Sequence, residues 1–385
     1  MLVYFSVSGF YSFGKKEQTV DFRAKPRSRL ANTKYEYNFN LSNKYKPMKS
    51  AVFFGQNASG KTNLFLAIKT CLSIIKKGLK ATIEESEDFF QNALNKKCNS
   101  ISFGLGITEG NHLFEFFIKF DKNFVIEEFL KIDGDKIYEL KDHEIEFNRK
   151  LFFEIPEMSK MITNSLLADD SETILIRLKF LPLLRVDDFF KCTDKIMLQM
   201  TSSYSKNYLM NFTESKKQFF EENKEIILDV LSLIDASITD FKFHESLKDQ
   251  EQRYDILIQR NEMFFRFQIE SEGVKKIIQL MISIVDLIKH NKILIIDELD
   301  SSISTYALIR LFNELINTQE NSSGQLIVSS HNIMLFDISF LNSQQIFITS
   351  KDIDFCTQIK SFYEFDVRSE KKNAYLDYLK GFYNE

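Results

Sequence analysis

The chain contains no tryptophan, only 4 prolines and only 4 cysteines among its 385 residues. The cysteines, Cys71, Cys98, Cys192 and Cys356, are scattered, without the C-x-x-C or histidine spacing of a zinc site and without the pattern of a disulfide framework. This usage fits a reducing compartment, and we expect a cytoplasmic protein. The 39 phenylalanines suggest a bias in the coding DNA rather than an aromatic binding surface.

Long apolar runs and an excess of positive charge are also missing. The longest apolar stretch, Ile277 to Ile288, is interrupted by Gln279 and Asp286 and is too short to span a bilayer. The first five residues lack the basic segment of a signal peptide, so we expect no membrane partner. Because the formal net charge is -4, any nucleic-acid contact has to come from a local patch.

One basic stretch, from Lys15 to Lys49, is the candidate for such a patch, with Phe22, Tyr35 and Tyr37 interleaved. A solvated loop with a strand edge explains it, and so does a surface for nucleic acid or an acidic partner. Its cationic residues are Lys15, Lys16, Arg23, Lys25, Arg27, Arg29, Lys34, Lys44, Lys46 and Lys49.

Residues 55 to 62 form a complete G-x-x-x-x-G-K-T phosphate loop. It follows the apolar run 51–54 and opens the helical pattern 64–68, so strand, loop and helix start come in the required order. The loop predicts a nucleoside triphosphate site, with backbone N–H groups ringing a phosphate. In it, Lys61 reaches the β/γ-phosphates and Thr62 can ligate Mg²⁺. The loop residues with Asn63 are Gly55, Asn57, Ala58, Ser59, Gly60, Lys61 and Thr62.

The pattern along the chain predicts three regions. Residues 1–150 combine the phosphate loop with strands at 101–107, 112–120 and 124–132, which read as an antiparallel meander. Residues 151–234 change to leucine and isoleucine at three- and four-residue spacing, which predicts a helical insert too short for a coiled-coil arm. Residues 235–385 return to strands and then alternate helix and strand.

The strand pattern 292–296 ends in Asp297 and Glu298. A carboxylate at the C-terminal end of a parallel strand beside the phosphate-loop strand can hold Mg²⁺, and we assign this to Asp297. The side chain of the adjacent Glu298 then points in a different direction from that of Asp297, and it is a candidate general base for the attacking water.

Three further elements accompany this pair. Ser271-Glu272-Gly273 stands where strand pattern gives way to helix, and a serine hydroxyl with glycine-exposed N–H groups there would make a second phosphate-binding surface. His331 follows the strand pattern 325–329 and Ser330. Asp300 follows the acidic pair.

On these residues the chain resembles the ABC-type ATPases, the class that includes transporter engines and the SMC/Rad50/RecF group. The resemblance implies an α/β fold, an ABC-type P-loop ATPase head with a mixed β-sheet, an antiparallel β-subdomain and a helical insert. It implies that Gly55 to Thr62 is Walker A, Asp297 and Glu298 are Walker B, and Asp300 is the D-loop. Ser271 and Gly273 would form a degenerate signature motif, and His331 the γ-phosphate switch histidine. It also implies ATP and Mg²⁺ as cofactors and a head-to-head dimer in which one protomer's signature completes the other's site.

The opening 3–13, the core 57–63 and the ending 375–383 are similar to the abortive-infection ATPases of prokaryotic phage defence, of the AbiL/RloA type and including the ATPase of PARIS-like systems. Such ATPases control a separately encoded toxic effector, often a nuclease. A RecF-like DNA-repair ATPase is the alternative. A transporter subunit is disfavoured because Glu270-Ser271-Glu272-Gly273-Val274 replaces L-S-G-G-Q, and Asp352-x-Asp354 lacks the fuller pattern of a built-in TOPRIM nuclease.

Overall fold

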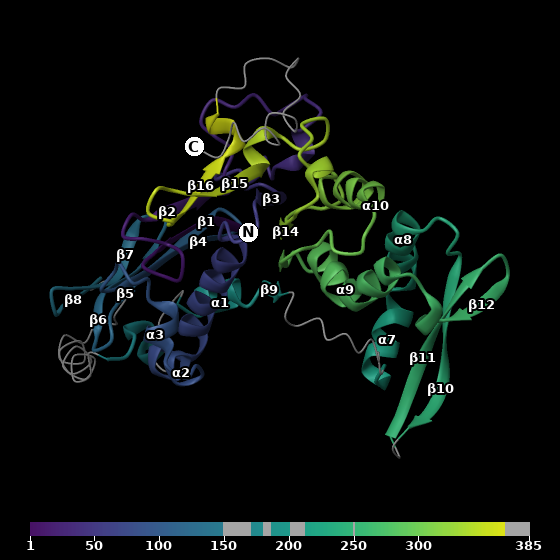
Figure 1. The fold of residues 1–385 in the computed structure, drawn as a ribbon, viewed down its shortest axis with the longest axis horizontal. Coiled ribbons are helices and arrows are strands. Elements are labelled where there is room, and N and C mark those ends of the chain that lie inside the picture. The colour runs from purple at the N-terminus through teal and green to yellow at the C-terminus, as the bar shows by residue number, and fades with distance from the viewer. Residues whose placement is uncertain (149–170, 180–185, 201–211, 249–250, 366–385) are drawn as a thin grey trace.

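The computed structural model describes residues 1–148, 171–179, 186–200, 212–248 and 251–365, and three sheets organise them (Figure 1). The first, in the order β2-β1-β4-β5-β6-β7-β8, comprises β1 Leu2–Ser8, β2 Gln18–Asp21, β4 Ile101–Glu109, β5 His112–Phe120, β6 Val125–Ile132, β7 Asp135–Lys141 and β8 Glu144–Phe147. The second, in the order β16-β15-β3-β14-β13-β9, comprises β3 Ser50–Gly55, β9 Ile196–Gln199, β13 Ile293–Ile296, β14 Gln325–Ser329, β15 Ile346–Lys351 and β16 Thr357–Ser361. The third comprises β10 Asp240–Lys248, β11 Glu251–Arg260 and β12 Met263–Arg266.

Helices of 5 to 18 residues cover these sheets. They are α1 Lys61–Lys77, α2 Leu79–Glu84, α3 Phe89–Ala93, α5 Ile174–Leu178, α6 Val186–Thr193, α7 Glu214–Glu222, α8 Lys224–Ile234, α9 Glu272–Lys289 and α10 Thr305–Arg310, which continues as a π-helical turn Leu311–Ile316. Short 3₁₀ turns lie at Glu36–Asn38, Phe267–Ile269, Ile333–Leu335, Ser343–Gln345 and Phe362–Glu364.

The six-stranded sheet is the centre of the molecule, and it is buried on both faces. Strands β9, β13, β14, β3 and β15 are parallel, and β16 closes one edge antiparallel to β15. Successive side chains of a strand point to opposite faces, so Phe53 joins the core shared with α1, while Phe54 joins the core shared with α9 and α10. This explains why these strands read as continuous apolar runs.

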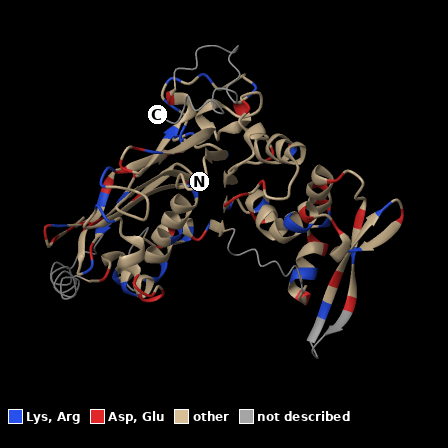
Figure 2. Cartoon of the chain, in the orientation of Figure 1, with Lys and Arg blue, Asp and Glu red and all other residues tan. Residues whose placement is uncertain are grey.

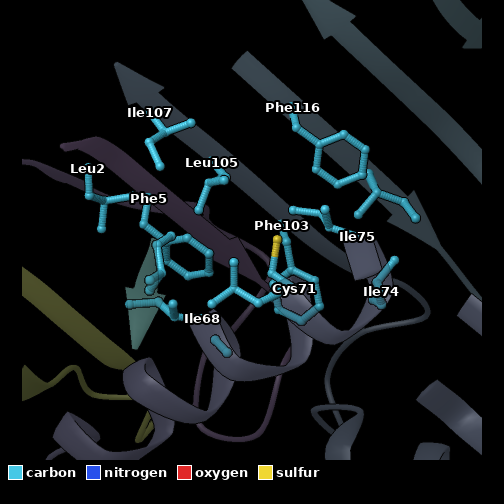
Figure 3. Close-up of a cluster of buried hydrophobic side chains, with 14 of the residues drawn as sticks. Leu2, Phe5, Ile68, Cys71, Ile74, Ile75, Phe103, Leu105, Ile107 and Phe116 are labelled. Carbon is cyan, nitrogen blue, oxygen red and sulfur yellow. The ribbon is translucent and has the colours of Figure 1, made fainter. Parts of the chain in front are cut away.

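Helix α1 connects the central sheet to the seven-stranded antiparallel sheet. Figure 3 shows Ile68, Cys71 and Ile75 of the helix facing Phe103 and Leu105 of β4, all fully buried. Burial of the thiol in this core raises the pKa of Cys71. The phosphate loop ends in the first turn of this helix, so the packing of α1 also positions the loop.

The three-stranded sheet lies at the other end of the molecule, beside α7, α8 and α9 (Figure 1). Its inner face places Tyr254, Ile256 and Ile258 in the core that also contains α9. Strand β11 leads through β12 directly to Ser271, the first residue of the predicted second phosphate surface. This sheet is therefore joined to that surface by only a few residues.

The expected fold class, α/β with a mixed sheet and an antiparallel β-subdomain, is confirmed. The expected meander is present as β4, β5 and β6, and it extends into β7 and β8. The described residues of the insert 151–234 include the helices α5, α6, α7 and α8, and also the strand β9, which pairs with β13. Part of the insert, and the chain ending at 375–385, lie outside the described residues.

Charged residues of the described chain lie mainly outside the central sheet. Figure 2 shows lysine and arginine interspersed with aspartate and glutamate on the helices and on the two antiparallel sheets, whereas β3, β9, β13 and β14 contain no charged residue. None of the helices in the described ranges is long and apolar enough to cross a membrane.

Candidate nucleotide site

The predicted phosphate loop connects β3 to α1. Gly55 ends β3, Lys61 begins α1, and the turn between them has left-handed backbone at Ala58 (φ 62°) and Gly60 (φ 115°). A side chain at Gly60 would be strained at this φ, and its Cβ would lie 2.1 Å from Oγ1 of Thr357. Position 60 therefore requires glycine for two reasons, the left-handed backbone of the turn and the close approach of Thr357.

Hydroxyl groups from outside the motif hold the loop in place. The Ser59 hydroxyl lies 2.7 Å from the Thr349 hydroxyl on β15, and Thr357 of β16 donates to the Ser59 carbonyl at 2.8 Å. Thr357 also lies 2.7 Å from the Ser12 hydroxyl, which accepts a hydrogen bond from Asn63 Nδ2 at 2.7 Å. The β15–β16 hairpin and the segment after β1 therefore brace the back of the loop.

Lys61 lies across the loop and is buried. Its Nζ donates to the carbonyls of Gly55 at 2.6 Å and Gln56 at 3.2 Å. Desolvation lowers the pKa of Lys61, while the carboxylates of Asp297 and Glu298, and of Asp300, oppose that shift. Asn57 and Ala58 are exposed at the top of the loop.

Asp297 reaches the phosphate loop across one strand, because β14 lies between β13 and β3 rather than β13 lying next to β3 as expected. Its buried carboxylate accepts hydrogen bonds from the hydroxyls of Thr62 at 2.9 Å and Ser329 at 2.6 Å. The oxygens of Thr62 and Asp297 thus converge at the start of α1. This donor set fits Mg²⁺, which prefers oxygen ligands and usually retains waters and substrate phosphates in its shell.

Glu298 has a left-handed backbone, with φ 54°, which is uncommon for a residue other than glycine. Its N–H donates to the Ser329 hydroxyl at 2.8 Å, and its carbonyl accepts from Lys276 Nζ at 2.7 Å. The turn directs the side chain away from Asp297 and toward His331, whose Nε2 lies 3.5 Å from Glu298 Oε1. Both side chains are partly exposed, at 36% for Glu298 and 40% for His331.

Asp300 accepts a hydrogen bond from the His331 N–H at 2.9 Å through Oδ2. Its other oxygen, Oδ1, is buried without a hydrogen-bond partner among the residues that the structure describes. The sequence-predicted Thr62, Asp297, Glu298, Asp300 and His331 therefore form one continuous group beside the phosphate loop.

The predicted signature residues lie at the start of α9 and contact other groups. Ser271 caps the helix by accepting from the Val274 N–H at 3.3 Å. A Cβ on Gly273 would lie 2.6 Å from the Ser302 carbonyl, so α9 packs tightly against the segment after Asp300. Ser271 is exposed, and its hydroxyl is available to a group outside its own helix.

An ion-pair network holds the residue before Ser271. The carboxylate of Glu270, with only 3% of its side chain exposed, pairs with both terminal nitrogens of Arg260, at 2.6 and 2.8 Å. Arg260 Nη2 also contacts Asp235 at 2.9 Å. Residues at the ends of β11 and α8 therefore hold Glu270, and with it the segment that leads into α9.

Sequence reasoning did not assign roles to Ser329, Lys276, Thr349 or Thr357. Ser329 ends a buried strand next to the phosphate-loop strand, which is a signal that could have identified it. Burial lowers the pKa of Lys276 to about 8, although Asp300, Glu298 and Asp297 act in the opposite direction.

The carboxylate of Asp352, from the Asp352-x-Asp354 sequence, stabilises the turn that follows it. It accepts hydrogen bonds from the N–H groups of Asp354 and Cys356 at 2.9 and 2.8 Å.

Residues 50–337 match a family model described as "AAA domain, putative AbiEii toxin, Type IV TA system", and the chain belongs to this family. No curated protein matches it. Among solved structures it is similar to an SMC head domain from Thermotoga maritima, with 14% identity, a TM-score of 0.46 and coverage of 94% of this chain and 98% of that one. It is also similar to an Smc head domain with a coiled coil and joint from Pyrococcus yayanosii, with 11% identity, a TM-score of 0.46 and coverage of 94% and 96%.

Proposed function

We propose that this protein is an ABC-type ATPase that binds Mg²⁺ and ATP and hydrolyses the nucleotide. The observation that carries the proposal is the placement of Thr62, Asp297 and Ser329 in one hydrogen-bonded chain, with Glu298 turned toward His331 beside it. A bound Mg²⁺ would neutralise charge that develops on the transferred phosphoryl group.

Each residue then has a defined task. The loop N–H groups and Lys61 bind the phosphates, while Thr62 and Asp297 would hold the metal. Glu298 orients the attacking water and accepts its proton, and His331 contacts the γ-phosphate beside it. Both Glu298 and His331 are partly exposed, so a water can reach them.

The exposed position of Ser271 supports a composite site. In this arrangement Ser271 and Gly273 of one protomer contact the nucleotide held by the phosphate loop of its partner, so the active form is a head-to-head dimer or a higher oligomer. A dimer that closes on two nucleotides also supplies a switch, because ATP then has different affinity for the open and closed states.

We further propose that the switch is a sensor or scaffold in antiphage defence, where it controls a separate toxic effector, possibly a nuclease. The family's description, which names a toxin of a toxin–antitoxin system, supports this role. Cells that carry the gene with its neighbouring effector should resist some phages, and Lys61→Ala or Glu298→Gln should change that protection. Plaque counts across a phage panel, together with pull-down of the effector, test this part.

The enzymatic part is tested with purified protein. Lys61→Ala removes a charge-assisted contact to the phosphates, which contributes about 1.5–3 kcal/mol, so affinity for a fluorescent ATP analogue should fall at least tenfold. Glu298→Gln keeps its shape and should retain ATP while turnover stops. Unchanged nucleotide affinity in Lys61→Ala would refute the phosphate-loop assignment.

A RecF-like DNA-repair ATPase is the second candidate, and the exposed side chains of Lys15, Arg27 and Arg29 favour it. Other members of the basic stretch are engaged elsewhere: Arg23 pairs with Asp21, and buried Lys49 donates to the Thr318 carbonyl. Strong, salt-sensitive DNA binding that is lost when Lys15, Arg27 and Arg29 are neutralised, without phage protection, would favour this function.

A further inference from the structure

Lys276 connects the helix that carries Ser271 to the turn that carries Glu298. It lies in the second turn of α9 and is 4% exposed. Its Nζ donates to the carbonyls of Glu298 at 2.7 Å, Leu299 at 3.1 Å and Ser301 at 3.1 Å, and to the Ser301 hydroxyl at 2.5 Å. A single ammonium group therefore binds three carbonyl groups of the turn from Glu298 to Ser301.

This turn needs an external restraint. Glu298 occupies the left-handed region, which costs energy for a residue with a side chain and persists only where neighbours hold it. Ser329 holds its N–H and Lys276 holds its carbonyl, so the peptide units on both sides of the Glu298 Cα are fixed. The direction of the Glu298 side chain depends on these two restraints.

The contact also transmits position between two functional segments. Helix α9 begins at the Ser271 cap, five residues before Lys276, and Gly273 packs against the Ser302 carbonyl. The start of α9 and the turn 298–302 therefore touch at two points, Gly273 and Lys276. A displacement of one segment has to move the other, because packed interiors do not deform continuously.

We propose that Lys276 is a positioning residue that makes the Ser271 helix and the Glu298 turn move as one body. In a composite dimer, the segment offered to the partner's nucleotide is thus linked to the base that acts on the protomer's own nucleotide. This inference rests on the proposed ATPase function, which it deepens by coupling the two half-sites. Lys276 itself touches no nucleotide and acts only through the turn.

Lys276→Met tests the proposal because it keeps the length of the side chain and removes every donor. Lys289→Met is the matched control, since Lys289 lies on the same helix, is exposed, and donates to Asn223 at 2.7 Å far from the turn. Lys276→Arg retains the charge and the donors and should restore part of the function. If Lys276→Met does not fold, Lys276→Gln takes its place with the same expected changes, because its uncharged amide on a shorter stem cannot reach all the carbonyls that Nζ contacts.

Hydrogen–deuterium exchange of the nucleotide-free chain gives the first readout. In Lys276→Met we expect exchange to accelerate on the order of tenfold at the amides of residues 299–303 and in the first turn of α9, and to stay unchanged in Lys289→Met. Unchanged exchange in the turn would overturn the proposal, and faster exchange in the turn alone would overturn the coupling. This readout does not depend on whether the protein hydrolyses ATP.

Steady-state kinetics give the second readout. We expect kcat of Lys276→Met to fall on the order of tenfold or more, because small displacements of a reacting group are costly, while affinity for an ATP analogue changes less than about twofold. Equal loss of binding and turnover would indicate a general structural role and contradict the proposal. A wild-type protein without turnover would instead contradict the proposed ATPase function, and the exchange measurement would still decide the role of Lys276.

Discussion

Ser329→Ala should destabilise the protein far more than an ordinary serine substitution. The Ser329 hydroxyl is fully buried, donates to the Asp297 carboxylate at 2.6 Å and accepts from the Glu298 N–H at 2.8 Å. A hydrogen bond to a charged group contributes about 1.5–3 kcal/mol, and the buried N–H left without an acceptor adds to the loss. We therefore expect the free energy of unfolding to fall by about 3 kcal/mol, with ATP turnover falling more than ATP affinity.

Ser339→Ala is the matched control for this prediction. Its hydroxyl also donates to a carboxylate, that of Asp337 at 2.7 Å, but the pair is exposed to water. An exposed interaction of this kind contributes about 0–1 kcal/mol. Urea unfolding followed by circular dichroism compares the two variants. Equal losses of stability would refute the claim that the Ser329 hydroxyl links Asp297 to the Glu298 turn.

Two further predictions concern buried residues, one in the antiparallel sheet and one in the phosphate loop. Burial raises the pKa of Glu128 from 4.5 to about 7, although Tyr138 and the Leu175 and Ile174 N–H groups donate to it. The folded state holds this proton more tightly, so the stabilisation is complete below pH 4.5 and is lost as the pH rises to about 7, by about 3 kcal/mol. Glu128→Gln should remove this slope in urea unfolding between pH 5 and 7.5, and an unchanged slope would assign it to other groups. Gly60→Ala should abolish ATP-analogue binding, because its Cβ would meet Thr357 at 2.1 Å, whereas Gly134→Ala, also at positive φ but with nothing within 4 Å, should lose only about 1 kcal/mol of stability. Equal behaviour of the two glycine variants would contradict the crowding argument.

The phosphate loop and the Asp297–Glu298 pair could be predicted because each is contiguous in the sequence, with its strand directly before it. Lys276 could not be found in this way, since its role depends on the turn 298–301 being folded against α9. Thr357 braces the phosphate loop from a strand nearly 300 residues away, which no local pattern reveals. Strand β9 was missed because four residues between helical segments give too short a pattern to separate strand from helix.

The same limit applies to the antiparallel sheet. The meander could be predicted from apolar alternation and from turns at 108–111 and 133–135. Strands β7 and β8 were not predicted, because the turn that connects them uses Asp142 and His143, both at positive φ, in place of a glycine. Local turn chemistry was thus a weaker guide here than apolar patterning.

Mixing two inactive variants tests the composite ATPase site most directly. Glu298→Gln lacks the proposed base, and Ser271→Arg blocks the surface offered to the partner while leaving its own phosphate loop intact. In a random dimer of the two, one site combines an intact phosphate loop and base with an intact Ser271. Half of the dimers are mixed and one of their two sites is complete, so an equimolar mixture should recover about a quarter of wild-type ATP turnover. No recovery in samples where mixed dimers demonstrably form would contradict the composite site.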